Sequence, residues 1–277
     1  MGTSTSFGGP RNSTPLIPSW LDSDERPSTS GASDESSRQS EDNVEISSVS
    51  AKSPQRFKTP RRLFNTWIKS GGSDTRSRNR AIARYITSSL GGSKNATQRM
   101  RASSIAAGRL AHFLVTANQI GFPRALRQIN LEHLAGKSTH DVLRELIDYF
   151  CSECSTLDEN IARSCLAEVF AEFEDEFNFA EDSTINLYQI QILIESFIAR
   201  SIVIRIINDI GNKIISLTPE TIAEEQLEEN LYGYIQGNVN DACHNCGLNF
   251  ASVKMSDINR ITKLAYKATF DLLSSLE

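Results

Sequence analysis

Residues 185–210 decide the fold, and they read INLYQIQILIESFIARSIVIRIINDI. Many of these residues are β-branched, as in strands, but strands average only about five or six residues. The large apolar side chains recur at helical spacing, at Ile190, Leu193, Ile194, Phe197, Ile198 and Ile202. The stretch therefore predicts a long buried helix. It is not a membrane span, which needs about 20 largely uncharged residues, because charged side chains interrupt it at Glu195, Arg200, Arg205 and Asp209.

The same period recurs from about Ala96 to the end of the chain, and we expect six or seven helices and no pair of strands. Two of these helices have a start signal. Ser138 stands three residues before Asp141, and Thr156 stands three residues before Glu159, which are arrangements of the capping-box type. The predicted fold class is an all-α helical bundle.

Two helices near the C-terminus have predicted limits or faces. Thr218 and Pro219 open an acidic helix that we expect to end at about Gly237. The last helix begins near Ser256. We expect its buried side to consist of Ile258, Ile261, Leu264, Ala265, Ala268 and Leu272.

Residues 1–55 differ sharply from the bundle. The first fifty positions hold 14 serines, several prolines and almost no periodic apolar pattern, so we expect a disordered tail. One apolar island interrupts it, at Pro15, Leu16, Ile17, Pro18 and Trp20, followed by Leu21. Prolines keep such a segment extended, which lowers the entropic cost of inserting its side chains into a partner's groove. We interpret the island as a docking element.

Charge divides the chain into three parts. Residues 1–50 hold 3 basic and 8 acidic side chains, residues 51–109 hold 14 and 1, and residues 110–277 hold 12 and 25. We therefore expect a tail at 1–55, a basic arm or linker at 56–95 and a helical domain at 96–277. The arm has three interpretations: it contacts nucleic acid through Arg76, Arg78, Arg80 and Arg84, it packs on the acidic body, or it is a solvated linker.

Within the arm, one short segment carries an apolar pattern. Leu63, Phe64, Trp67 and Ile68 share one face of a helix, and Gly71 and Gly72 then break the pattern.

No catalytic arrangement stands out in the sequence. The four histidines, His112, His133, His140 and His244, occur in unrelated contexts. Residues 135–139 read AGKST, but the first glycine that a phosphate-binding loop requires is Leu131. Two C-x-x-C pairs, Cys151 with Cys154 and Cys243 with Cys246, have zinc-ligand spacing, although we favour buried thiols over a metal site. We expect no enzyme activity, no cofactor and no metal.

The first residues carry a different kind of chemistry. Five scattered cysteines and the lack of an apolar segment after Met1 indicate a cytoplasmic protein. Gly2 is small enough for Met1 to be removed, which would leave an α-amino group with an ordinary pKa near 7.7–8.0. That amine is partly neutral at cellular pH and is a usable nucleophile. A lipid-anchored scaffold, acylated at Gly2, is an alternative interpretation of the same residues.

The opening residues MGTSTSFGGP at 1–10 and PLIPSWL at 15–21 resemble the start of the QatB family of the bacterial Qat anti-phage system. The rest of the chain is similar in layout. The resemblance implies a non-enzymatic protein that binds the system's QueC-like enzyme, QatC, and acts in one system with an ATPase, QatA.

The resemblance also implies a site of modification. A QueC enzyme activates 7-carboxy-7-deazaguanine with ATP and aminates it, and a protein amine is able to replace ammonia. The attacking nitrogen would belong to Gly2, or to Gly8 or Gly9 if the tail is trimmed, while the island at residues 15–20 docks on the enzyme. The second function that the sequence leaves open is a nucleic-acid-binding adaptor that uses the basic arm.

Overall fold

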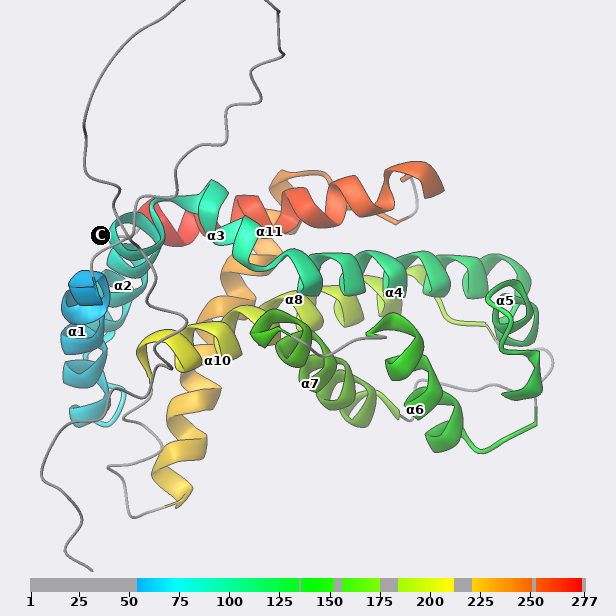
Figure 1. Ribbon diagram of the computed structural model, residues 1–277, viewed down its shortest axis with the longest axis horizontal. Helices are drawn as coiled ribbons and strands as arrows, with labels where there is room; N and C mark the ends of the chain where they lie inside the picture. The colour runs from blue at the N-terminus through cyan, green and yellow to red at the C-terminus, as the bar shows by residue number, and fades with distance from the viewer. Residues whose placement is uncertain are drawn as a thin grey trace, which may run out of the picture. The chain divides into compact units, whose positions relative to one another are not determined.

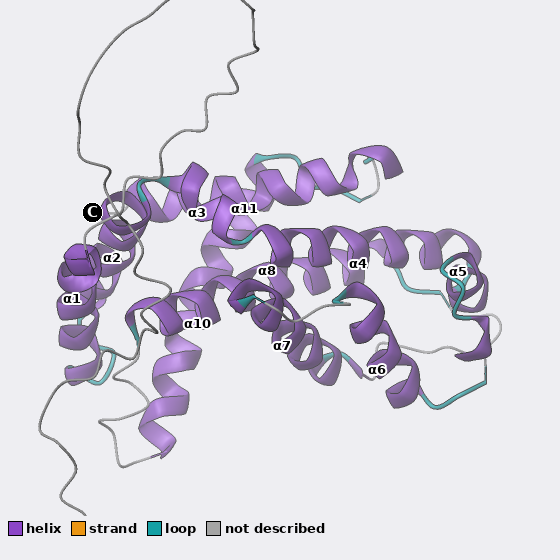
Figure 2. Cartoon of the chain, in the orientation of Figure 1, coloured by secondary structure: helices purple, strands orange, loops and turns teal. Residues whose placement is uncertain are grey.

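The computed structural model describes residues 54–134, 136–151, 156–174, 184–211, 221–250 and 253–275. This part of the chain consists of helices and the turns that join them, as Figures 1 and 2 show, so the predicted all-α class is confirmed. The α-helices are α1 (Lys58–Lys69), α2 (Thr75–Arg84), α3 (Ser93–Arg99), α4 (Arg101–Ile120), α5 (Phe122–Gln128), α6 (Thr139–Phe150), α7 (Leu157–Glu172), α8 (Leu187–Ile210), α10 (Thr221–Asn245) and α11 (Ile258–Ser275). Shorter helical turns are η2 (Pro54–Phe57), η3 (Tyr85–Leu90), η4 (Glu132–Leu134) and η6 (Met255–Asp257).

Helix α8 is the centre of the body and contacts α1, α4, α7 and α10. Its start is fixed by a capping box, in which the Asn186 side chain accepts a hydrogen bond from the Gln189 backbone N–H at 2.8 Å. Buried residues occur on every side of it, and a helix that is apolar all round is normally a core helix. The long buried helix predicted from residues 185–210 is therefore confirmed. No helix in the described ranges is both long and apolar enough to cross a bilayer.

Helices α1 and α2 pack against each other and belong to the same body. On the α1 face predicted from the spacing, Phe64 and Trp67 are fully buried, while Leu63 and Ile68 are partly buried. The turn after α1 is tight: the Trp67 indole N–H donates to the Gly72 carbonyl at 3.0 Å, and Gly72 has a φ of +84°. Asp74 then caps α2 by accepting from the Ser77 N–H at 3.0 Å.

The expected arm at 56–95 is thus folded into the helical body. Residues Ser50–Glu277 form one compact unit, and α2 contacts α11 while α1 contacts α8. The apolar side chains of α1, α2 and η3 share a single core cluster with α8, α10 and α11. Among the three interpretations of the basic segment, packing on the body describes this part of the structure.

The capping signals predicted for α6 and α7 are present. Ser138 accepts from the Asp141 N–H at 3.2 Å, and Thr156 and Glu159 form a reciprocal capping box. Within the AGKST segment, Ser138 is therefore the N-cap of α6 and Thr139 is the first residue of that helix.

The predicted end of α10 at Gly237 is wrong. The helix continues to Asn245, and its buried side chains Leu231, Ile235, Val239 and Cys243 recur every four residues across the glycine. A glycine inside a helix costs only about 1 kcal/mol relative to alanine, so packing of this apolar row carries the helix through it. Thr218 and Pro219 lie outside the described residues.

The predicted buried face of α11 is partly wrong. Ile258 and Ala265 are buried, but Leu264 is exposed and the core side continues instead through Thr262, Tyr266, Thr269, Phe270 and Leu273. The threonine hydroxyls donate to carbonyls of their own helix, and the Tyr266 hydroxyl meets the Ser201 hydroxyl at 2.7 Å. Polar residues whose hydroxyls have such partners are able to face a core. The spacing of apolar residues in the sequence does not reveal them.

Candidate functional site

The predicted modification and docking residues lie outside the described part of the chain. These are Gly2, Gly8, Gly9, Pro15, Leu16, Ile17, Pro18 and Trp20. Their roles stay predictions. The described body is therefore the part in which a surface or cavity is open to structural argument.

The four arginines predicted to contact nucleic acid do not form one free patch. Arg76, Arg80 and Arg84 are exposed on α2. Arg78 instead stacks over the ring of Tyr234 on α10, with 3.8 Å between its guanidinium carbon and the ring centre. Burial lowers the pKa of Arg78. Its guanidinium helps to hold α2 on α10. The other three arginines lie on the exposed side of α2.

Basic residues from α1, α3 and α8 gather around Asp209 near the end of α8. The Tyr85 hydroxyl donates to the Asp209 carboxylate at 2.8 Å, and Arg205 and Arg99 lie 3.4 and 3.7 Å from the same carboxylate. Arg61 donates two hydrogen bonds to the Asp209 backbone carbonyl. Burial raises the pKa of Tyr85 far above its ordinary value, so its hydroxyl stays protonated as a donor.

The cysteines are distributed over separate helices. Cys151 ends α6, Cys243 and Cys246 lie near the end of α10, and Cys154 is outside the described residues. Burial raises the pKa of the Cys243 thiol. Within the described ranges, no group of three or more His, Cys, Asp or Glu side chains is arranged to hold a metal ion.

The histidines are likewise spread over the body. All four are exposed: His112 on α4, His133 on η4, His140 on α6 and His244 on α10.

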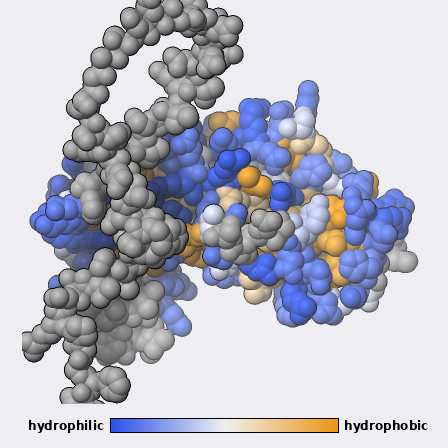
Figure 3. All heavy atoms as spheres, in the orientation of Figure 1, coloured by the Kyte–Doolittle hydropathy of each residue, from blue (hydrophilic) through white to orange (hydrophobic). Residues whose placement is uncertain are grey.

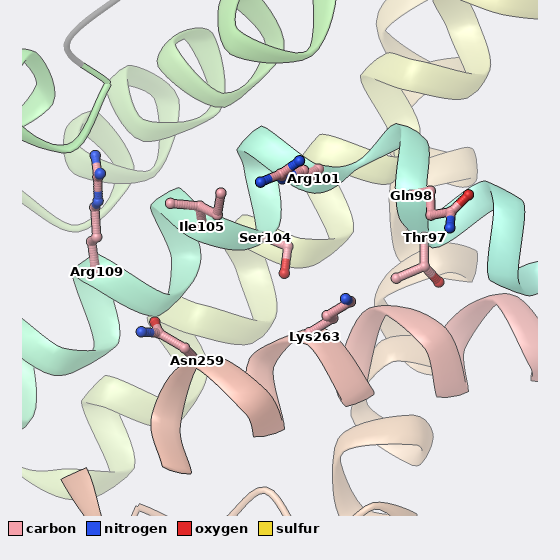
Figure 4. Close-up of a pocket in the computed structure, with 8 residues that line it drawn as sticks. All are labelled: Thr97, Gln98, Arg101, Ser104, Ile105, Arg109, Asn259 and Lys263. Atoms are coloured by element: carbon pink, nitrogen blue, oxygen red, sulfur yellow. The ribbon is translucent and has the colours of Figure 1, made fainter. Parts of the chain in front are cut away.

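A cationic cavity of about 740 Å³ lies between α4 and α11, with α3 at one end (Figure 4). Its lining consists of Thr97, Gln98, Arg101, Ser104, Ile105, Arg109, Asn259 and Lys263. Figure 4 shows Asn259 and Lys263 extending from α11 toward α4. Three of the lining side chains are cations and none is an acid. This cavity is the strongest candidate for binding an anionic ligand in the described part of the chain.

The signal for half of this cavity is present in the sequence. Arg101, Ile105 and Arg109 are spaced four residues apart, which places them on one face of a helix. Asn259 and Lys263 have the same spacing on α11, but nothing in the sequence brings these two helices together. Sequence reasoning counted Arg101 and Arg109 only as part of a basic segment.

A second cavity, between α7, α8 and α10, has the opposite charge. It has a volume of about 740 Å³ and includes five glutamates in its lining: Glu168, Glu172, Glu225, Glu228 and Glu229. Arg200 pairs with Glu168 at 3.2 Å and with Glu172 at 2.5 Å, and it lies over the Tyr232 ring. These contacts join α7, α8 and α10, and we assign them a structural role.

Comparison with protein families identifies the chain. Residues 91–273, about two thirds of the chain, match the family of the Qat anti-phage system associated protein QatB. The chain belongs to the QatB family. It therefore has a role in the Qat anti-phage defence system, and the family is described as a protein associated with that system. Searches of curated proteins and of solved structures gave no match.

The region that matches the QatB family contains most of the described helices. It begins at Gly91, between η3 and α3, and includes α3 to α8, α10 and nearly all of α11. Both helices that form the cationic cavity are within it. Helices α1 and α2 precede the matched region, although they pack in the same core.

Proposed function

We propose that this QatB-family protein is a non-enzymatic component of the Qat system that presents its N-terminal amine to the QueC-like enzyme, QatC. The observation that carries the proposal is membership in the QatB family, together with the sequence at residues 1–21. The island at residues 15–20 docks on the enzyme, and the residues before it enter the active site. Because the reaction consumes ATP, we place it in the cytoplasm, where the ATPase QatA is a further candidate partner.

The proposed reaction is acyl transfer to a protein amine. The enzyme activates the carboxyl group of a 7-carboxy-7-deazaguanine with ATP. The neutral amine of Gly2 then attacks the activated carbonyl carbon, an amide bond forms, the activating group leaves with its electron pair and the nitrogen loses a proton. Attachment to a docked segment raises the effective concentration of the amine at the carbonyl. If the segment is trimmed, Gly8 or Gly9 supplies the nitrogen.

Mass spectrometry tests the proposal directly. The full chain is co-expressed with its QueC-like enzyme, purified and digested, and the N-terminal peptide is expected to carry the added mass of one deazaguanine acyl group. A chain that copurifies with the enzyme but keeps an unmodified N-terminal peptide would contradict the conjugation step.

A pair of variants tests the docking element separately. Leu16→Ala/Trp20→Ala is expected to abolish copurification with the enzyme and the added mass. Val44→Ala/Ile46→Ala removes two apolar side chains from the same N-terminal region, outside the island, and is expected to change neither. Equal losses in both variants would show that the island has no specific role.

A further inference from the structure

A continuous groove runs along the outer face of α4. The cationic cavity of about 740 Å³ and a neighbouring cavity of about 450 Å³ share Arg109 and Asn259 in their linings. We call the two together the α4–α11 groove. From Arg101 to His112 the helix rises about 16 Å, which is the length of about four or five stacked nucleotides at about 3.4 Å each.

One part of the α4–α11 groove is built to attract anions. Arg101 and Lys263 are exposed, and neither forms an ion pair with another described residue. Arg109 is held in place because its guanidinium donates to the Phe150 carbonyl at 3.1 Å. No acidic side chain of the described residues lines either cavity. At the start of α4, the Asp158 carboxylate accepts hydrogen bonds from the Ala102 N–H and the Ser103 hydroxyl.

The other part of the α4–α11 groove offers an aromatic surface. Tyr149 is 42% exposed, and its ring packs edge-on against Phe150 with 5.5 Å between the ring centres. Phe150 is itself buried against Phe113 at 5.9 Å. The exposed ring is therefore supported from behind, and His112 lines the same cavity. A supported, half-exposed ring is a platform on which a nucleobase is able to stack.

Cations along a groove, with an aromatic ring at one end, match the two chemical parts of a nucleotide strand. The carboxylates of an acidic peptide would satisfy the cations, but Asp and Glu side chains carry no flat ring that stacks on Tyr149. We propose that the α4–α11 groove binds single-stranded nucleic acid, with Arg101, Arg109 and Lys263 on the phosphates and a base stacked on Tyr149. Arg78 of α2, one of the four arginines that the sequence suggested for this role, is instead stacked on Tyr234.

Binding of a labelled oligothymidylate to the full chain tests the proposal, measured by fluorescence anisotropy between about 50 and 200 mM salt. Arg101→Gln/Lys263→Gln is expected to weaken binding about tenfold or more at the low-salt end. It is also expected to reduce the slope of log affinity against log salt by about 1.4, because each phosphate contact to a single strand contributes about 0.7. The matched control, Arg76→Gln/Arg80→Gln, removes two exposed cations from α2 and is expected to leave both quantities nearly unchanged.

A second variant separates stacking from charge. Tyr149→Leu is expected to weaken binding about fivefold or more with the salt slope unchanged, because it removes a π-face and no cation. Circular dichroism of each variant checks that the helices are intact.

Three results would overturn the proposal. They are no binding by the unmodified chain at low salt, equal weakening by the α2 control, and displacement of the oligonucleotide by hexaglutamate at the same concentration as by unlabelled oligonucleotide. The last result would assign the groove to acidic protein segments. None of these measurements depends on modification of the N-terminus.

Discussion

Asp158 joins two helices through a single carboxylate. It lies in the first turn of α7, and it accepts hydrogen bonds from the Ala102 N–H and the Ser103 hydroxyl at the start of α4. Burial nevertheless raises the pKa of Asp158, because the loss of hydration outweighs these hydrogen bonds. The folded state therefore holds a proton on this group more tightly than the unfolded chain does.

The raised pKa of Asp158 determines how the free energy of unfolding changes with pH. Where the folded state binds more protons than the unfolded state, the free energy of unfolding rises as the pH falls. We expect the unmodified chain to gain stability relative to Asp158→Asn on acidification from about pH 7 to about pH 4, near the ordinary aspartate pKa. Urea unfolding of both chains across this range measures the difference. A difference that is constant, or that shrinks on acidification, would contradict the assignment.

At the scale of elements, two glycines in the same body are expected to respond oppositely to the same substitution. Gly237 lies inside α10 with open space where a Cβ atom would be, whereas Gly72 has a φ of +84° and its Cβ would approach Leu227 to 3.1 Å. Gly237→Ala is expected to raise the free energy of unfolding by about 0.5–1 kcal/mol. Gly72→Ala is expected to lower it by about 1 kcal/mol or more.

Denaturant unfolding of the two alanine variants checks this pair. Destabilisation by Gly237→Ala would mean that α10 does end near this glycine, as the sequence predicted, and that its continuation to Asn245 is wrong.

Comparison of the predicted and observed helices shows which structural features follow from local sequence patterns. The class of the fold, the caps of α6 and α7 and the burial of α8 follow from local patterns, and all were predictable. The buried face of α11 was not, because its polar members Thr262, Thr269 and Tyr266 do not belong to an apolar pattern. The two threonine hydroxyls donate to carbonyls of their own helix, and the Tyr266 hydroxyl bonds to Ser201 of α8. The limit of α10 was missed for a similar reason, since a packed apolar row outweighs the helix propensity of one glycine.

At the scale of the whole molecule, the candidate groove depends on contacts between distant segments. Arg101 and Arg109 on α4 were visible as basic residues, but Lys263 is more than 150 positions further along the chain, and Tyr149 lies on α6. Spacing predicts which residues share a face of one helix, but it does not predict which helices pack side by side. Among the coloured residues on the face that Figure 3 shows, hydrophilic residues predominate and hydrophobic residues form small groups.

Truncation tests whether the helices before the region matched by the QatB family are part of one cooperative body. α1, α2 and η3 bury Phe64, Trp67, Ile82 and Ile86 completely. At about 1.5–3 kcal/mol for each side chain, their loss is comparable to the total stability of about 5–15 kcal/mol of a typical domain. We expect residues 51–277 to unfold in one thermal transition, measured by circular dichroism, and residues 91–277 to lack it. An unchanged transition in the shorter chain would show that the basic segment is a dispensable appendage, and the apolar surfaces of α8, α10 and α11 beneath it would then have to be stable in contact with water.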